Sequence, residues 1–290
     1  MSTIMERLTS LLCARAAALP LSRCRITRPY LLDRSGIGTR GTAMFFAVPY
    51  LVSADAHDAS RSVSLYAVPR DYHLYVRQLG EEILPVLARD FPGVRFSLFS
   101  DHSPLAEVDG AARAGLGVVG LNGLLITPDY GSFIFIAEVV TSADYETAVG
   151  RAEPVFPDAP PACIRCGACR RACPAGCLDG QSGRDMTSCL SALTQKKGAL
   201  TEEEGRALSR HPLAWGCDTC QIVCPMNRAA LDGRHDTPIP FFRESRLPRL
   251  TLPVLDGMTD DAFSQRAYAW RGRSVMRRGL LLHSSKENNS

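Results

Sequence analysis

Nine of the eleven cysteines in this chain of 290 residues lie between Cys163 and Cys224. This concentration constrains the fold more than any other feature of the sequence. A disulfide framework would distribute its cysteines along the whole chain. In a reducing compartment a dense local cluster more often binds metal than forms disulfides. The sequence therefore predicts one metal-binding segment, near residues 161–235.

The first part of this segment has a specific spacing. It reads Cys163-x2-Cys166-x2-Cys169-x3-Cys173-Pro174, the run by which bacterial ferredoxins hold 4Fe–4S clusters. Zinc is the main alternative, because Cys-x2-Cys pairs also bind zinc. A tetrahedral zinc site has no use for the Cys-x3-Cys-Pro ending, so the run favours iron–sulfur clusters.

A second set of cysteines follows, and together the two sets supply eight thiolates for two 4Fe–4S clusters. In two-cluster ferredoxins the fourth cysteine of each run ligates the other cluster. This exchange assigns one cluster to Cys163, Cys166, Cys169 and Cys224, and places Cys173 with Cys217 and Cys220. Cys189 completes the second cluster, because Val223 stands where a third cysteine of the run would be. We expect the three remaining cysteines, Cys13, Cys24 and Cys177, to be small buried hydrophobes.

Composition excludes several classes of protein. Hydrophobic residues make up 46% and charged residues 22% of the chain, values typical of a folded globular protein. The net charge of +3 is too small to indicate a nucleic-acid binder by itself. The longest apolar stretch, near Gly131–Val140, has the length of a strand, and the N-terminus lacks the pattern of a secretory signal. We therefore expect a cytoplasmic monomer with no membrane partner.

Hydrophobic patterning predicts an α/β (α+β) domain before the cysteines. We expect strands over 42–52 and 94–99, a helix over 72–91 that Pro85 can kink, and a hairpin or strand pair over 124–141. A short amphipathic helix should precede Pro20. Residues 142–162 are rich in proline and read as a linker. The predicted domains are 1–160, a ferredoxin-like domain at 161–235, and a helical extension with a polar tail at 236–290.

Asp101 is the candidate for acid chemistry. It follows a predicted strand and precedes Pro104 and a glycine-rich passage, and loops at the ends of strands often carry sites. The alternative is an aspartate that only caps a turn. Glu107 and Asp109 are nearby alternatives for the acid, although each is also typical of the first turn of a helix.

Several motifs in the same order resemble the cobalamin-dependent epoxyqueuosine reductases of tRNA modification. The resemblance extends from about Phe45 to about Leu282. It rests, besides the cysteine run, on Arg70-Asp-Tyr-His73, Asp101-His-Ser-Pro104, Arg113-Ala-Gly-Leu-Gly117, Cys189-Leu-Ser-Ala-Leu-Thr194 and Gly216-Cys-Asp-Thr-Cys-Gln-Ile-Val-Cys-Pro225.

The resemblance implies a cobalamin-binding domain before residue 160 and two clusters that reduce the cobalt. It implies that Asp101 is the general acid for opening an epoxide. It also places a further group of residues at the cobalamin, namely Asp71, Tyr72, His73, Asp101, Gly115, Gly117, Asn122, Ser191 and Asp218. The implied partners are tRNA and an electron donor such as a ferredoxin or flavodoxin.

The chain also departs from the family pattern. Leu121 stands where family members usually have lysine, and Val118 where they usually have tryptophan. The family's helical repeats that hold tRNA are expected to be missing, although arginines gather between Arg243 and Arg278 and could contact phosphates. Two alternatives therefore stay open: a reductase of the same architecture with another small substrate, and a ferredoxin-type electron carrier without enzymatic activity.

Overall fold

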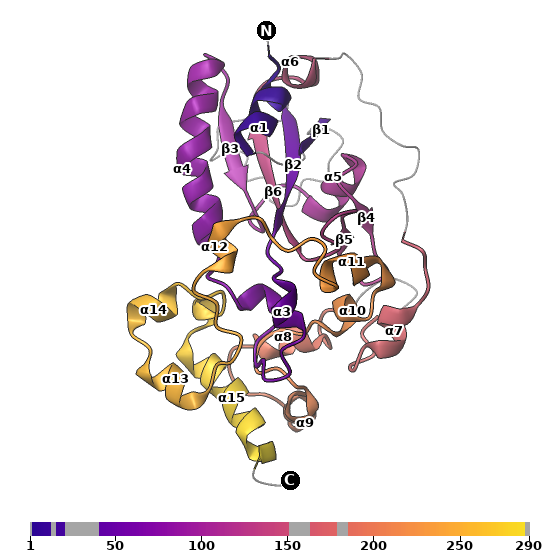
Figure 1. The fold of residues 1–290 in the computed structure, drawn as a ribbon, viewed down its shortest axis with the longest axis vertical. Coiled ribbons are helices and arrows are strands. Elements are labelled where there is room, and N and C mark those ends of the chain that lie inside the picture. Colours follow the sequence, from indigo (N-terminus) through magenta and orange to yellow (C-terminus); the bar gives the residue numbers. More distant parts are fainter. Residues whose placement is uncertain (1, 13–15, 21–40, 151–162, 179–184, 288–290) are drawn as a thin grey trace.

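The computed structural model describes residues 2–12, 16–20, 41–150, 163–178 and 185–287. Within these ranges the chain is mixed α and β, with the strands in its first half (Figure 1). The strands are β1 (Ala16–Pro20), β2 (Thr42–Pro49), β3 (Phe96–Phe99), β4 (Val118–Val119), β5 (Leu125–Ile126) and β6 (Ile134–Thr141).

Helices occur throughout the described residues. Those of the first half are α1 (Ile4–Leu12), α3 (Ser53–Ala56), η2 (Leu65–Ala67), α4 (Tyr72–Asp90), α5 (Glu107–Arg113) and α6 (Tyr145–Val149). Those of the second half are α7 (Ala168–Ala172), α8 (Leu190–Thr194), α9 (Glu202–Arg210), α10 (Thr219–Ile222), η3 (Pro225–Asn227), α11 (Arg228–Leu231), α12 (Pro240–Arg243), α13 (Leu252–Gly257), α14 (Asp260–Ser264), η4 (Ala269–Arg271) and α15 (Arg273–Glu287).

The main sheet has the strand order β1-β2-β6-β3, and every pairing in it is antiparallel. Strand β6 lies in the interior of the sheet, with Phe45 of β2 and Phe99 of β3 directly opposite Glu138. Because side chains directly opposite each other share a face of the sheet, these three residues point to the same side.

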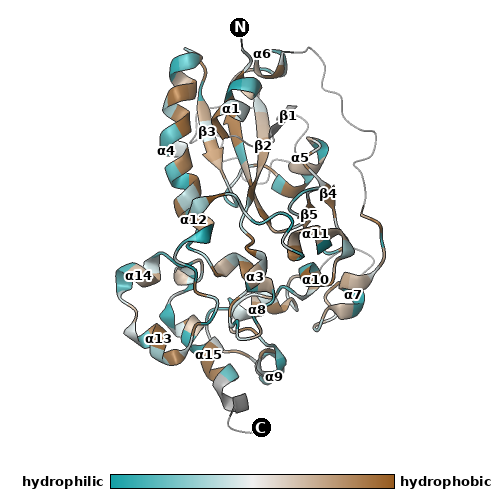
Figure 2. Cartoon of the chain, viewed as in Figure 1, coloured by the Kyte–Doolittle hydropathy of each residue, from teal (hydrophilic) through white to brown (hydrophobic). Residues whose placement is uncertain are grey.

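The two faces of the sheet are covered by different helices (Figures 1 and 2). Met44, Phe46 and Val48 of β2 pack in the core that includes buried residues of α1 and α4. Ala43 and Phe45 point the other way, into a smaller core with α5. This alternation follows from the period of two in a strand.

Helix α4 is positioned at its N-terminus by a side-chain cap. The Asp71 carboxylate accepts a hydrogen bond from the backbone amide of His73 at 2.9 Å, as expected for aspartate at this position. The helix continues through Pro85 to Asp90 and buries Val76, Leu79, Ile83 and Leu87. The cap fixes the start of the helix, and with it Tyr72, beside the sheet.

Most of the elements expected from the sequence are present, with two corrections. The short N-terminal helix is α1, and the strand expected over 42–52 is β2, which ends at Pro49. The expected hairpin over 124–141 is wrong, because β5 pairs with β4 in a separate two-stranded sheet and β6 pairs with β2 and β3. The isolated Thr127–Gly131 bridge lies in the turn between β5 and β6. The linker expected over 142–162 is wrong in its first part, because residues 145–149 form α6, and Ala148 and Val149 pack in the main core. Residues 151–162, which include the expected domain boundary, lie outside the described residues.

A third core joins the segment after β2 to the C-terminal part of the chain. Val63 and Val68 pack there with Trp215, Tyr268 and Met276, all of which are buried. The predicted domain limits thus remain a prediction, since a segment of the first predicted domain shares its core with the last. No helix among the described residues is long and apolar enough to cross a membrane.

A buried amide, the side chain of Asn227, connects the cysteine segment to the sheet domain, which is the part of the chain that carries β1 to β6. Asn227 is fully buried, accepts a hydrogen bond from the Ser132 backbone amide at 2.9 Å, and donates to the Ser132 hydroxyl and the Gln221 carbonyl. Gly131, at φ 57°, must lack a side chain here because a Cβ would lie 2.3 Å from the Asn227 amide oxygen.

Replacing Asn227 with Ala leaves the Ser132 amide without its buried partner. We expect the Asn227→Ala change to lower the free energy of unfolding by about 2–4 kcal/mol, measured by denaturant titration under anaerobic conditions. The control Gln78→Ala removes an exposed amide of α4 and should cost less than about 0.5 kcal/mol. Equal stability of the two variants would contradict this account of the docking.

Candidate functional site

The cysteines of the first predicted set lie together. The thiol of Cys169, in α7, has Cys224 and Cys166 as electrostatic neighbours, and Cys224 has Cys166 and Cys163. Burial raises the pKa of both the Cys169 and the Cys224 thiols. Helices α7 and α10 pack against each other, which brings these separate parts of the sequence together.

The second predicted set lies beside the first. Cys217 and Cys220 both have Cys189 as an electrostatic neighbour, and burial raises the pKa of Cys220 to about 12. Cys177 lies with its sulfur 3.4 Å from that of Cys173 and is buried, as expected for a spare cysteine. Because metal ligation requires thiolates, a metal bound here would have to displace protons that burial favours.

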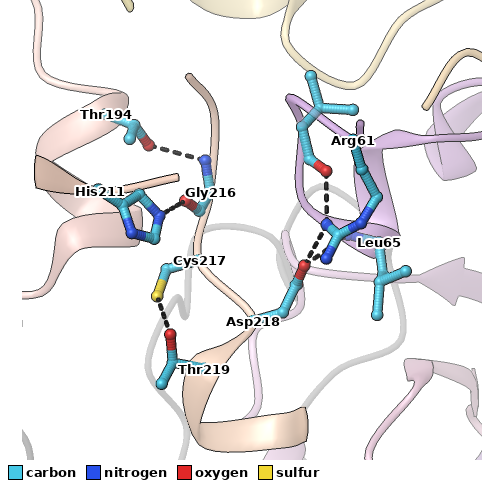
Figure 3. A network of polar contacts seen from close by, with 9 residues as sticks. Arg61, Leu65, Thr194, His211, Gly216, Cys217, Asp218 and Thr219 are labelled. Carbon is cyan, nitrogen blue, oxygen red and sulfur yellow. Dashed lines mark hydrogen bonds and ion pairs between the residues drawn. The ribbon is translucent and has the colours of Figure 1, made fainter. Parts of the chain in front are cut away.

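Hydrogen bonds on both sides hold the segment that carries Cys217 (Figure 3). The Gly216 amide donates to the Thr194 hydroxyl at 2.9 Å, and the His211 ring lies 2.9 Å from the Gly216 carbonyl. Gly216 has φ 75°, and a Cβ there would lie 2.4 Å from the Ser64 hydroxyl. Glycine is therefore required at this position.

On the other side of this segment, Asp218 forms a buried ion pair with Arg61 at 2.5 Å (Figure 3). Asp218 also accepts a hydrogen bond from the Leu65 backbone amide at 3.0 Å. Burial raises the pKa of Asp218, whereas Arg61 lowers it. The ion pair ties the cysteine segment to the residues that follow β2.

A cavity of about 250 Å³ lies between the sheet domain and the second cysteine set. Its walls are mainly apolar and aromatic, with a few hydroxyl groups and no histidine among the described residues. Its lining includes Tyr50, Tyr66, Ser132, Phe135, Ser191 and Thr219, together with Cys173, Cys189, Cys217 and Cys220.

Asp101 lies close to this cavity although it is not one of the lining residues. It follows β3 and has φ 62°, a left-handed conformation that aspartate tolerates better than most residues. The Tyr72 hydroxyl donates to the Asp101 carboxylate. The Tyr72 ring stacks on Phe135, with centroids 3.8 Å apart and planes 12° apart, and Phe135 lines the cavity. Burial raises the pKa of Tyr66, and the charge of Asp101 adds to that rise.

The other residues expected from the Arg70–His73 motif surround Tyr72. Asp71 caps α4 and also lies 2.8 Å from the Nδ1 atom of His73. The His73 ring packs on Tyr72 and faces His102 edge-on at 6.0 Å. The motif therefore holds the tyrosine that contacts Asp101, and neither Asp71 nor His73 lines the cavity.

The remaining predicted contacts fall into two groups. Ser191 lines the cavity, and Asn122 is buried with its side chain hydrogen-bonded to the Cys220 thiol. Gly115 and Gly117 have local reasons for being glycine: Gly115 has φ 82°, and a Cβ at Gly117 would meet the Ile126 carbonyl at 2.5 Å. Asp218 is held by Arg61. Gly115, Gly117 and Asp218 do not line the cavity, and their contact with a cofactor remains a prediction.

Sequence reasoning missed the aromatic walls of the cavity. Tyr50 follows β2, Tyr66 belongs to η2, and Phe135 belongs to β6. No spacing motif links these residues, and each is typical of an ordinary core. Their apolar pattern alone could not show that one wall of the core is left open.

The two nearby carboxyl alternatives also have defined positions. Glu107 accepts a hydrogen bond from the Asp101 backbone amide at 2.7 Å, and Asp109 pairs with Arg113 at 3.0 Å. Both lie in the first turn of α5, as expected. Asp109 thus binds Arg113 and not the Asp101 loop, whereas Glu107 binds the backbone of Asp101 itself.

Most of the C-terminal arginines have partners within the protein. Arg246 pairs with Asp55, and Arg277 pairs with Asp256. Arg273 binds Asp260 and two backbone carbonyls, and Arg278 donates to the Gly198 and Lys196 carbonyls. These contacts indicate that much of this basic stretch joins elements of the fold.

The donor set at the cavity fits iron–sulfur clusters and a large, flat, mostly apolar cofactor. Thiols from three separate segments converge, which suits clusters held by cysteine. Aromatic rings and hydroxyl groups line the same cavity.

A family model, the 4Fe-4S double cluster binding domain, matches residues 162–227. Curated relatives match most of the chain. An epoxyqueuosine reductase of Listeria monocytogenes is 35% identical over 218 residues, which are 73% of this chain and 54% of that protein. One of Gloeobacter violaceus is 33% identical over 217 residues, or 74% and 64%. The chain thus spans between about half and two thirds of the length of these relatives.

Solved structures share the fold. An epoxyqueuosine reductase of Streptococcus thermophilus superposes with a TM-score of 0.71 at 21% identity, over 96% of this chain and 79% of that one. An epoxyqueuosine reductase with an epoxyqueuosine-modified tRNA-Tyr stem loop gives a TM-score of 0.72 at 23% identity, with the same coverage. In a Bacillus subtilis structure with a TM-score of 0.69, the catalytic aspartate loop is swung out of the active site.

The Arg61–Asp218 pair gives a testable pH dependence. In Arg61→Ala, Asp218 loses its buried cation, so we expect a loss of about 3–5 kcal/mol in the free energy of unfolding at neutral pH. The pKa of Asp218 then rises further above its unfolded value, and stability falls as pH rises through that range. The loss should therefore be smaller at pH 5 than at pH 8 in anaerobic denaturant titrations. A loss independent of pH would contradict this.

Proposed function

We propose that this chain reduces the epoxide of epoxyqueuosine in tRNA to the alkene of queuosine. A stretch of 218 residues aligns with an epoxyqueuosine reductase at 35% identity. The observation that carries the proposal is the cavity lined by the second cysteine set and by Phe135, because Tyr72 stacks on Phe135 and donates to Asp101. An electron path and an acid therefore lie near one cavity.

The eight cysteines of the two sets would hold two 4Fe–4S clusters. Cys163, Cys166, Cys169 and Cys224 are electrostatic neighbours in the structure, which supports their assignment to one cluster. Cys173, Cys189, Cys217 and Cys220 all line the cavity, which supports their assignment to the other. The second cluster would thus deliver electrons at the cavity wall, and the first would receive them from a donor such as a ferredoxin or flavodoxin.

The second cluster would lie against the four cysteines of the cavity, and the side formed by Tyr50 and Phe135 would contact a cobalamin. When bound, cobalamin supplies the low-potential metal centre that reduces the epoxide. Tyr50 and Phe135 would pack against the flat ring, and the Ser132, Ser191 and Thr219 hydroxyls would meet its polar substituents. Burial raises the pKa of Tyr50 well above its usual range, so this wall stays uncharged.

Asp101 would act as the general acid. Conversion of an epoxide to an alkene takes up two electrons and two protons and releases the oxygen as water. A proton must therefore reach the developing alkoxide, and a carboxylic acid beside an apolar cavity can supply it. Tyr72 holds the Asp101 carboxyl through its hydroxyl, and the stacking on Phe135 fixes Tyr72 in turn.

The proposed substrate is the modified anticodon loop of a tRNA, and the proposed setting is the cytoplasm, with the chain acting as a monomer. The solved relative with a modified tRNA stem loop supports this substrate class. Because most C-terminal arginines are engaged inside the protein, we expect only weak attraction to the rest of a tRNA.

A second candidate is the same chemistry on a smaller epoxide. Leu121 packs against Cys169, Cys177 and Leu178, so an apolar contact stands where the family usually has lysine. The chain thus has no cation at this position, beside the cysteines, which favours a less anionic substrate. Comparing turnover of an anticodon stem loop with that of the free nucleoside would separate the two candidates.

The ligand assignment can be tested with two cysteines that lie side by side. After anaerobic reconstitution, Cys189→Ala should lose the second cluster and fall from about eight to about four iron atoms per chain. Cys177→Ala should keep about eight, because Cys177, whose sulfur lies 3.4 Å from that of Cys173, is outside the assigned ligand set. Iron analysis and electron paramagnetic resonance provide the readout. The assignment would be wrong if Cys177→Ala lost a cluster and Cys189→Ala kept both.

The acid can be tested with a matched pair of aspartates. Asp101→Asn should lower the rate of oxygen removal from an epoxyqueuosine stem loop by about 10²–10⁴-fold, because the amide cannot donate the proton. Asp109→Asn should leave the rate within a few-fold, since Asp109 pairs with Arg113. Mass spectrometry of the nucleoside gives the loss of one oxygen. Wild-type turnover by Asp101→Asn would exclude Asp101 as the acid.

A further inference from the structure

A buried carboxyl group that the proposed reaction does not use lies under the Asp101 loop. Glu138 belongs to the interior strand β6 and is fully buried. Its neighbours across the sheet are Phe45 and Phe99, so it points into the small apolar core beneath α5. A glutamate there is costly to bury, and an apolar residue would pack equally well.

Hydrogen bonds connect this carboxyl to the loop. The Ser103 hydroxyl donates to Oε1 of Glu138 and accepts from the Leu105 backbone amide at 2.9 Å. The Ser100 hydroxyl donates to the Ile136 carbonyl of the same strand at 2.7 Å. The loop is therefore fastened to β6 on both sides of Asp101.

The backbone of Asp101 is fastened separately. Its amide donates to the Glu107 carboxylate at 2.7 Å, which holds the left-handed conformation at φ 62°. Burial raises the pKa of Glu138 well above its usual range, and the charge of Glu107 raises it further. The residues facing Glu138 from β2 and β3 are the uncharged Phe45 and Phe99, so α5 contributes the charge through Glu107.

We propose that Glu138 is a positioning residue for Asp101, whose carboxyl anchors Ser103 and so holds the loop in which the Glu107 carboxylate binds the Asp101 amide. The inference rests on the proposed role of Asp101 as the acid. An uncharged carboxyl satisfies the Ser103 hydroxyl without placing a second negative charge beside Glu107. A deprotonated Glu138 would repel Glu107 and loosen the loop.

Three variants separate a positioning role of Glu138 from a packing role. Glu138→Gln keeps the acceptor, the size and the lack of charge. Glu138→Ala removes the acceptor, and Ser103→Ala removes the same contact from the loop side if Glu138→Ala does not fold. Glu81→Gln, at an exposed site on α4, is the control.

The first readouts do not depend on turnover. In the anaerobically reconstituted protein, infrared spectroscopy should show the carbonyl band of a protonated carboxyl at neutral pH, absent in Glu138→Gln and present in Glu81→Gln. Hydrogen exchange of residues 100–107 should speed up at least about tenfold in Glu138→Ala or Ser103→Ala, and stay at the wild-type rate in Glu138→Gln. Wild-type exchange in both loosening variants, or a missing infrared band, would overturn the inference.

Turnover then tests the consequence for the acid. Glu138→Ala should lower kcat on the stem loop by about 10–100-fold, with KM nearly unchanged. Glu138→Gln should keep kcat within a few-fold of the wild-type value. It should also abolish the loss of activity that we expect of the wild type at high pH, where Glu138 would lose its proton. A wild-type protein that exchanges as expected but does not turn over the stem loop would refute the proposed function and leave the loop anchor supported. Equal kcat in the Ala and Gln variants would overturn the anchor's role.

Discussion

The position of the candidate site depends on a few buried polar contacts that dock the cysteine segment on the sheet domain. Asn227 and Gln221 bind Ser132, just before β6, and Asp218 binds Arg61, after β2. Buried hydrogen bonds and ion pairs are directional and costly to break, so they fix one relative placement. Without that placement there would be no cavity between the cysteines and the aromatic wall.

This docking explains how separate functions meet in one place. The cysteines that line the cavity come from the regions around Cys173, Cys189 and Cys217–Cys220, while Tyr50, Tyr66 and Phe135 come from the sheet domain. The acid reaches the same region through Tyr72. Each domain thus contributes one wall, and the proposed chemistry needs both.

Much of this arrangement could be predicted from the sequence, and the missing part has a physical reason. Cysteine spacing is a local pattern, so the cluster type could be inferred, and the structure brings the predicted ligand cysteines together. The exact ligand sets and the acid role of Asp101 stay predictions, drawn from cysteine spacing, a strand end and a motif. The antiparallel sheet order and the pairing of β5 with β4 depend on long-range packing, which no local pattern reports. For the same reason the sequence could not show that Asp218 pairs with Arg61, 157 residues away; its contact with a cofactor stays a prediction.

The central claim is that the docked domains form a cobalamin site, and equilibrium binding tests it most directly. The anaerobically reconstituted protein would be titrated with cobalamin and followed by absorbance, in parallel with Ser191→Trp, which fills the cavity. The account predicts saturable binding of one cobalamin per chain and binding at least about tenfold weaker in Ser191→Trp. Absence of binding by the protein with both clusters in place, or equal binding by the two proteins, would contradict it.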